Sequence, residues 1–285
     1  MKIKLKIKKI GANLSKAAFL ARGSARALLL PGRRLKILFS PNYGNEKTLR
    51  RAFSLSRHKI RFAAFTPENI RESDLVIPLL IQDVRLLQKS RDLLENNPIK
   101  IPTEEVVNLC DNKYLFNKTL VEKGFQDFVP KIGTNLPLPF MLKKKVTWAG
   151  DDCYLISDAE MQAKYREFIK SDDYFCQEII GGVNEYATHI LFKDGKIAET
   201  LTVKYTFYDE IPINGKSGFA YTRIAKCKCL DTFSSILTAI GYEGLCCFDY
   251  KIVDGKPKIF EINPRFGGSL GNYFFTFLDN LYSAA

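Results

Sequence analysis

Histidine is scarce in this 285-residue sequence, which contains only His58 and His189. Two histidines far apart along the chain argue against a His-rich metal site and against a Ser-His-Asp mechanism, so we expect both to be structural. The seven cysteines are odd in number and include no C-x-x-C pair. This usage argues against a disulfide framework and a zinc ribbon, and it fits a reducing cytosol.

Long apolar runs are absent as well, since none reaches the roughly 20 residues that a membrane-spanning helix needs. The composition of 46% hydrophobic and 26% charged residues is typical of a folded globular protein. Single cores stop growing at roughly 250 to 300 residues, so two or more subdomains are expected. We predict a cytoplasmic protein that is either soluble or peripheral on the inner face of a membrane.

Acidic residues are missing from the first 45 positions, and Glu46 is the first of them. The chain has 43 Lys and Arg against 31 Asp and Glu, a net charge of +12. Eleven of the basic residues precede position 37, which leaves 32 basic against 31 acidic residues in the remainder. Because nucleic-acid-binding proteins carry a basic stripe over the folded body, we expect no nucleic-acid partner.

The basic leader, residues 1–34, allows three interpretations. Lys alternates with Ile or Leu over 1–9, and small and apolar residues with a few Lys and Arg follow. An amphipathic segment attracted to anionic lipid is one interpretation, and it would give peripheral membrane contact. A transit peptide and a solvated basic tail are the other two.

The remainder reads as alternating strands and helices. Residues 35–40 predict a buried strand, 41–45 a loop and 46–56 a helix, the start of a βαβ unit. Apolar runs at 59–65 and 74–80 and a helix over 82–96 complete a small parallel-sheet domain, 35–110. The expected fold class is thus α/β in this part and α+β in the part that follows.

Two further units are predicted. In residues 111–173 we expect a helix over 111–124, strands at 138–143 and 152–156, and a helix over 157–170 opened by a capping box. In residues 174–285 we expect strands at 174–180, 184–193 and 196–204, a helix capped by Asp231, a hairpin over 245–263 and a last helix near 273–282.

The hairpin carries the most chemistry. If its loop has three residues, 254–256, Asp249 lies directly opposite Glu261. Alternation adds Lys251 and Asn263 to the same face. The opposite face then points into a core, with Phe248, Tyr250, Ile252, Phe260 and Ile262. Two close carboxylates repel unless a cation or a proton lies between them, and hard oxygen ligands suit Mg²⁺. The alternative is a solvent-facing strand with polar alternation, and a register slip of one residue would separate the pair.

The sequence Glu261-Ile-Asn-Pro-Arg-Phe-Gly-Gly-Ser269, with Asp249 one strand earlier, resembles the metal-binding end of the ATP-grasp superfamily, in the carbamoyl-phosphate synthase and biotin carboxylase branch. The resemblance implies a Rossmann-like N-terminal domain followed by a two-subdomain ATP-grasp fold, from residue 35 to the C-terminus. It implies Asp249, Glu261 and Asn263 as ligands of Mg²⁺, or of Mn²⁺. Arg265 is implied on phosphate or a substrate carboxylate.

The resemblance also implies the nucleotide contacts. Lys143 would contact the α- and β-phosphates, and Lys113 would be the earlier nucleotide-contacting lysine. Glu178, Ile179 and Ile180 resemble the segment that reads adenine, and Glu185 the acid that holds the ribose. Lys204 and Arg223 flank the segment 205–221, which we expect to help form an acceptor site. Each lysine, and Glu185, has the alternative of a solvated surface charge.

The implied activity is an ATP- and Mg²⁺-dependent ligation of a small carboxylate to an amine or a thiol through an acylphosphate. The sequence departs from the family after Lys143, where a glycine-rich loop is usual but only Gly150 occurs over 144–152. This departure leaves a second interpretation open, a nucleotide-binding but weakly catalytic module that the basic leader recruits to a membrane or a partner. The oligomeric state stays open.

Overall fold

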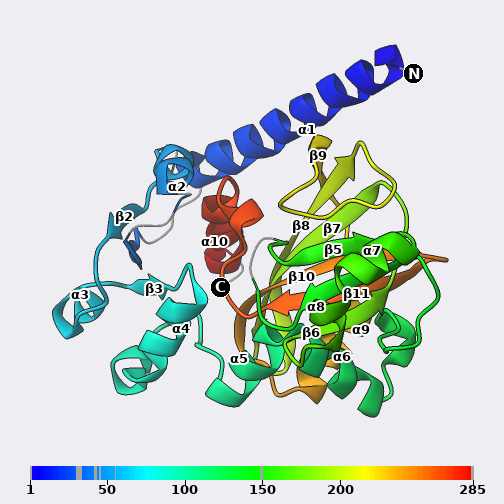
Figure 1. Cartoon of the computed structure of the whole chain (residues 1–285). Helices are drawn as coiled ribbons and strands as arrows, with labels where there is room; N and C mark the ends of the chain where they lie inside the picture. The colour runs from blue at the N-terminus through cyan, green and yellow to red at the C-terminus, as the bar shows by residue number, and fades with distance from the viewer. Residues whose placement is uncertain are drawn as a thin grey trace.

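The computed structural model describes residues 2–29, 34–41, 44, 46–54, 56–147 and 150–283, and side chains are considered outside 2–6, 22–29 and 280–283. The predicted loop 41–45 is therefore described only in part, and Trp148 and Ala149 of the predicted phosphate loop lie outside the described residues. Mixed parallel and antiparallel sheets with helices around them form the body (Figure 1).

The N-terminal sheet is parallel, in the order β2-β1-β3. Its strands are β1 (Lys36–Phe39), β2 (Lys59–Phe62) and β3 (Leu75–Ile77), and its helices are α2 (Glu46–Phe53), α3 (Pro67–Arg71) and α4 (Ile81–Gln88). β3 and most of β1 are buried, as parallel strands usually are, whereas the edge strand β2 alternates exposed Lys59 and Arg61 with half-buried Ile60 and Phe62. The predicted helix over 82–96 is shorter than expected, because α4 stops at Gln88 and a separate 3₁₀ turn, Arg91–Leu94, follows.

Two helices stand where one was predicted near position 111. They are α5 (Glu104–Asp111) and α6 (Lys113–Glu122). Thr103 caps α5 by accepting from the Val106 N–H, and Asn112, not Asp111, caps α6 by accepting from the Leu115 N–H. The cap therefore lies one residue later than predicted, and it sets Lys113 in the first turn of α6.

The small sheet is antiparallel, in the order β5-β4-β6. Its strands are β4 (Phe140–Lys144), β5 (Cys153–Ile156) and β6 (Tyr174–Glu178), and it is covered by α7 (Ala159–Lys164) and α8 (Arg166–Lys170). Asp158 caps α7. The helix is interrupted at Tyr165, so two short helices form where one helix over 157–170 was predicted. β6 pairs with β4, so this sheet extends past the predicted unit boundary at residue 173.

The large sheet is antiparallel, in the order β11-β10-β7-β8-β9. Its strands are β7 (Asn184–Lys193), β8 (Lys196–Phe207), β9 (Phe219–Ala225), β10 (Gly244–Val253) and β11 (Lys256–Asn263), and α9 (Leu230–Ala239) packs on one face. β8 continues three residues beyond the predicted end, where it pairs with β9, a strand the sequence did not predict. Cys229, not Asp231, is the N-cap of α9.

The last helix, α10 (Phe274–Ser283), joins the N-terminal sheet to the large sheet (Figure 1). Phe274 and Phe277 belong to a buried cluster that also contains Phe39 of β1 and Leu245 of β10. This shared core means that the N-terminal unit and the C-terminal end of the chain pack as one body.

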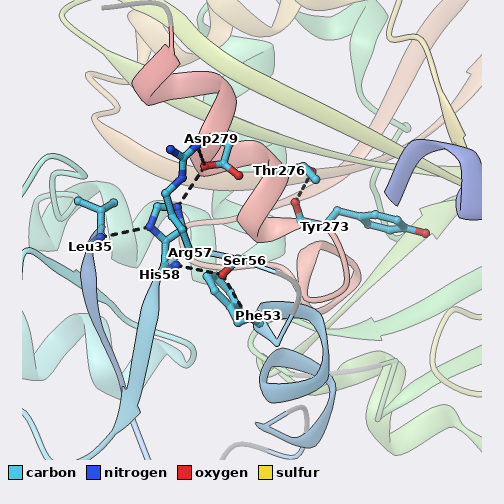
Figure 2. A network of polar contacts seen from close by, with 8 residues as sticks. All are labelled: Leu35, Phe53, Ser56, Arg57, His58, Tyr273, Thr276 and Asp279. Atoms are coloured by element: carbon cyan, nitrogen blue, oxygen red, sulfur yellow. Dashed lines mark hydrogen bonds and ion pairs between the residues drawn. The ribbon is translucent and has the colours of Figure 1, made fainter. Parts of the chain in front are cut away.

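A polar network fastens α10 to the N-terminal unit (Figure 2). The Leu35 N–H donates to Nδ1 of His58 at 3.2 Å, so the hydrogen of the neutral ring is on Nε2. That atom lies 3.3 Å from the Asp279 carboxylate, which also accepts from Arg57 at 3.1 Å. His58 is therefore structural, as the sequence suggested.

The leader forms a helix, α1 (Lys2–Leu29), that lies along β9 and reaches α10 (Figure 1). Phe19 packs edge-on against Tyr273 with ring centroids 5.8 Å apart, Ala12 is buried, and Lys16 donates to the Thr222 hydroxyl. The interpretation as a solvated tail is wrong for the described part of this segment, because it contributes side chains to the main core. None of the described helices has both the length and the apolar character needed to cross a bilayer.

Candidate active site

A cavity of about 350 Å³ lies between the small sheet and the large sheet. The ten residues predicted to contact the metal, the nucleotide or its phosphates all line it: Lys113, Lys143, Glu178, Ile179, Ile180, Glu185, Asp249, Glu261, Asn263 and Arg265. They come from α6, from both sheets and from the two segments that follow β6 and β11. The fold therefore gathers into one place residues spread over more than half of the chain.

The β10–β11 hairpin sets Asp249 opposite Glu261, as predicted. The predicted loop is wrong, however: Val253 pairs with Lys256, so the loop has two residues, and both Asp254 (φ 48°) and Gly255 (φ 79°) lie in the left-handed region. A β-bulge next to Asp249 shifts the register by one residue and restores the pairing.

The bulge also changes which β11 side chains face the core. Ile259 pairs with Tyr250 and is fully buried in the core, whereas Phe260 lines the cavity. Ile252, near the hairpin tip, is 39% exposed. The predicted core positions of Phe260 and Ile252 are thus wrong, while those of Phe248, Tyr250 and Ile262 are confirmed.

The pKa values of the two carboxyl groups are shifted in opposite directions. Burial, and then the nearby Glu261 carboxylate, raise the pKa of Asp249 well above its ordinary range. Burial acts to raise the pKa of Glu261, but Lys113, Asn263 and Lys143 together outweigh burial and lower that pKa to about 2. The Lys113 ammonium lies 2.8 Å from Glu261 Oε2. Glu261 is therefore ionised, and the charge of Asp249 depends on a further cation.

Asn263 joins the pair. Its Nδ2 donates to Asp249 at 3.0 Å and to Glu261 at 3.2 Å, and its Oδ1 accepts from Arg265 at 3.1 Å. In this arrangement the amide hydrogens, and not Oδ1, face the carboxylates, so the amide must turn over to ligate a cation. Among the described residues no three or more His, Cys, Asp or Glu side chains form a metal cluster. The candidate donor set is two carboxylates and one amide.

Three basic groups surround this acidic pair. Besides Glu261, Lys113 contacts the Thr147 carbonyl at 2.8 Å. Lys143 donates to Gln177 Oε1 at 2.7 Å and lies 5.0 Å from the centre of the Phe260 ring. Arg265, which is buried, also donates to the Phe266 carbonyl at 2.8 Å. All three cations line the same cavity, which favours binding of a polyanion.

Residues of β6, of β7 and of the segment between them line another part of the cavity. Glu178 accepts from the Lys131 N–H at 2.8 Å, and the Ile180 carbonyl accepts from Lys251 at 2.8 Å. Glu185 is buried and accepts from Asn214 at 2.9 Å. Burial raises the pKa of Glu185 from 4.5 to about 7, although Lys251, Asn214 and Lys143 all act to lower it.

A segment between β8 and β9 closes over the cavity and reaches the small sheet. Lys216 donates to the Cys153 carbonyl at 3.1 Å, and Lys216 lies 5.1 Å from the Tyr154 ring centre. Gly150 (φ +73°) lies so close that a Cβ atom there would be 2.3 Å from the Asn214 carbonyl oxygen. The one glycine of the predicted phosphate loop is thus required by this contact.

Several cavity residues were not predicted. Alternation with Asp249 had placed Lys251 on the right face but gave it no role. Tyr205 and Asn214 lie in the segment 205–221, which we expected to help form an acceptor site, but neither residue was singled out. The expected acceptor residues Lys204 and Arg223 do not line the cavity; they pair across β8 and β9, beside α1.

His189 supports the turn that follows Arg265. Its Nε2 lies 2.8 Å from the Ser269 hydroxyl, and burial, with Arg265 nearby, lowers its pKa to about 3. A Cβ atom on Gly267 would lie 2.5 Å from the His189 ring, so only glycine fits there. The neutral ring thus fixes the backbone between Arg265 and Ser269.

No protein-family model and no curated protein matches the chain. Solved structures do. An L-amino acid ligase from Bacillus licheniformis has a TM-score of 0.60 at 14% identity, covering 89% of this chain and 75% of the ligase. A D-alanine–D-alanine ligase from Bacillus anthracis has a TM-score of 0.56 at 15% identity, covering 86% and 91%.

A carboxyaminoimidazole ribonucleotide synthase from Aspergillus clavatus, complexed with ATP, has a TM-score of 0.54 at 13% identity, covering 83% of this chain and 71% of the synthase. At such identities the similarity concerns the fold. These structures are ATP-grasp ligases, as the motif around Glu261 led us to expect. The chain has the ATP-grasp fold.

Proposed function

We propose that the protein is an ATP- and Mg²⁺-dependent ligase that activates a small carboxylate as an acylphosphate. The observation that carries the proposal is the meeting of Asp249 and Glu261 with Lys113, Lys143 and Arg265 in one cavity. Paired carboxylates beside several cations are the surroundings that a metal-bound polyphosphate requires.

The residues fit a magnesium ion. Mg²⁺ takes one or two protein carboxylates and fills its other positions with water and phosphate oxygens, and Asp249 and Glu261 supply that pair. Burial and the Glu261 carboxylate raise the pKa of Asp249, and a divalent ion bound between the two carboxylates would favour the ionised form of Asp249. Asn263 fits as a third ligand with its amide turned over. Held by these residues, the ion would supply positive charge that neutralises a polyphosphate.

The residues also fit a nucleotide. The cavity of about 350 Å³ is large enough for one, since ligand pockets start at about 300 Å³. The part of the lining that contains Glu178, Ile179, Ile180 and Glu185 suits a base and a sugar. Lys143 and Lys113 suit the phosphates, where they would act as mobile point charges. Arg265 suits a phosphate or a carboxylate through two parallel hydrogen bonds.

In the proposed reaction a carboxylate oxygen of the substrate attacks the γ-phosphorus, and the bond to ADP breaks. The nitrogen of an amine, or a thiolate, then attacks the acyl carbon, and inorganic phosphate leaves. The chain itself contributes position and charge: Lys113, Lys143 and Arg265 hold the oxygens that gain negative charge, and the segment that carries Asn214 covers the cavity. An L-amino acid ligase and D-alanine–D-alanine ligase among the similar folds support amino acids as the first substrates to try.

The test is ADP release from ATP with pools of amino acids and small carboxylates. We expect release that depends on both Mg²⁺ and an acceptor, and its loss in Glu261→Gln, which keeps the shape and removes the charge. Glu122→Gln, on the exposed side of α6, is the control and should keep full activity. Unchanged turnover in Glu261→Gln would remove Glu261 from the site.

Tight Mg-ATP binding without turnover in any pool would instead support the weakly catalytic module. The observation in its favour is the glycine-poor segment after Lys143. Binding is measured separately, by calorimetry with a non-hydrolysable ATP analogue, so the two functions give different combinations of results.

A further inference from the structure

One side of α1 is committed to the folded body. Ala12, Lys16, Phe19 and Leu20 follow the spacing of one helix face, and all four are buried or half-buried. Phe19 and Leu20 pack against the main core, which contains Tyr273 of the segment before α10. This anchoring fixes the rotation of the helix about its axis, so the opposite side always faces away from the body.

The opposite side of α1 is apolar. Ile7, Ile10 and Leu14 recur at helical spacing and are 63%, 53% and 65% exposed. These are three of the largest exposures of aliphatic side chains among the described residues. Scattered single apolar residues on a surface are ordinary, but an aligned stripe on a fixed helix marks a contact surface.

The charge of α1 indicates what covers the stripe. The helix carries eight Lys and Arg and no acidic residue. A second copy of the chain would bring eight further positive charges against these, which disfavours self-association. Nucleic acid would neutralise the charge but leave the stripe in water. An anionic lipid surface would neutralise the charge and also remove the stripe from water, because aliphatic side chains enter the acyl boundary while lysines contact the headgroups.

We infer that α1 docks the protein on an anionic bilayer surface, lying in the interface with Ile7, Ile10 and Leu14 inserted. The helix does not cross the bilayer. Because Phe19 and Leu20 hold the same helix in the core, docking also fixes the orientation of the body, which a flexible lipid anchor would not do. This inference does not depend on the ligase activity, since it uses no residue of the cavity.

The test is flotation of the full chain with vesicles. We expect binding to phosphatidylcholine vesicles that contain one third phosphatidylserine, and weak binding to phosphatidylcholine alone. Raising the salt from about 0.1 M to about 0.5 M should weaken binding without abolishing it, because screening removes only the electrostatic part. Ile10→Ser with Leu14→Ser should weaken binding by about tenfold or more, through lost apolar insertion.

Leu86→Ser is the matched control, since Leu86 is 50% exposed on α4, and it should float like the wild type. All variants are checked by circular dichroism and thermal unfolding, which the exposed substitutions should leave unchanged. Lys8→Gln with Lys9→Gln should weaken binding to the anionic vesicles only, by about tenfold.

Three results would overturn the inference. The first is that the full chain does not float with anionic vesicles. The second is that the Ile10→Ser, Leu14→Ser variant floats like the wild type. The third is that sedimentation equilibrium gives a dimer that this double substitution converts to a monomer, which would assign the stripe to a second copy.

Discussion

Removing Lys113 tests how the acidic pair is held. In the substitution Lys113→Met the chain keeps an unbranched side chain of similar length but loses the ammonium group 2.8 Å from Glu261. Glu261 and Asp249 then still lie opposite each other, but without their ion-pair partner Lys113, and Lys143 is the lysine that continues to act on Glu261. The folded protein should lose stability at neutral pH, since one charge of a partly buried pair is left alone.

The magnitude follows from the pKa of Glu261. Burial acts to raise it, yet Lys113, with smaller contributions from Asn263 and Lys143, brings it from 4.5 down to about 2. A shift of this size corresponds to about 3 kcal/mol of stability above pH 4.5, which is lost as the pH falls through 2. The side chain is 24% exposed, so solvent screening reduces the expected loss to about 2 kcal/mol. For a chain of this size, the melting temperature should fall by about 4 °C.

Magnesium distinguishes this mechanism from a simple loss of packing. In the variant the carboxylates form a more negative site, so about 10 mM MgCl₂ should raise the melting temperature more than in the wild type. Lys118→Met, on the exposed side of α6, is the control, and its surface pair with Glu122 is worth less than about 0.5 kcal/mol. A variant with wild-type stability, or a loss that magnesium leaves untouched, would refute the reasoning.

Three other predictions concern stability. As the pH rises from 4.5 to 7, the free energy of unfolding of the wild type should fall by up to about 3 kcal/mol relative to Glu185→Gln, because the raised pKa makes ionisation of Glu185 costlier in the folded state. The same pH dependence in both proteins, measured by urea unfolding, would contradict this. Gly267→Ala should cost about 1–3 kcal/mol, since its Cβ meets the His189 ring, whereas Gly181→Ala should cost little, as measured by urea unfolding. Phe19→Ala should cost about 2 kcal/mol by thermal unfolding, and no loss would mean that α1 is not docked.

The pairing of Asp249 with Glu261 was predictable, although the argument used for it was incomplete. Asp-Gly with both residues at positive φ makes a two-residue loop, and that loop alone would set Asp249 opposite Phe260. The bulge adds one residue on β11 and returns Glu261 to its place. Such bulges depend on the packing of both faces of the sheet, so local sequence patterns do not reveal them.

Other parts of the site depend on contacts between distant segments. Asn214 reaches Glu185 from a segment without a periodic pattern, and its backbone meets Gly150 of the other sheet. Edge strand β9 shows no clean alternation, since α1 covers it. By contrast, the residues on β7, β10 and β11 were predicted, because their spacing and their motif are local properties of the chain.

The leader shows why composition alone gave three interpretations for one segment. An acid-free run of lysines and aliphatic residues indicates a charged, amphipathic piece of chain, but it does not say which face is used. Which face of the helix packs on the body depends on Tyr273, more than 250 residues away, because the Phe19 ring packs against the Tyr273 ring. Deleting residues 1–34 would therefore remove part of the core together with the outward stripe. Only substitutions confined to the outward side, at Ile10 and Leu14, separate a role at a lipid surface from a role in folding.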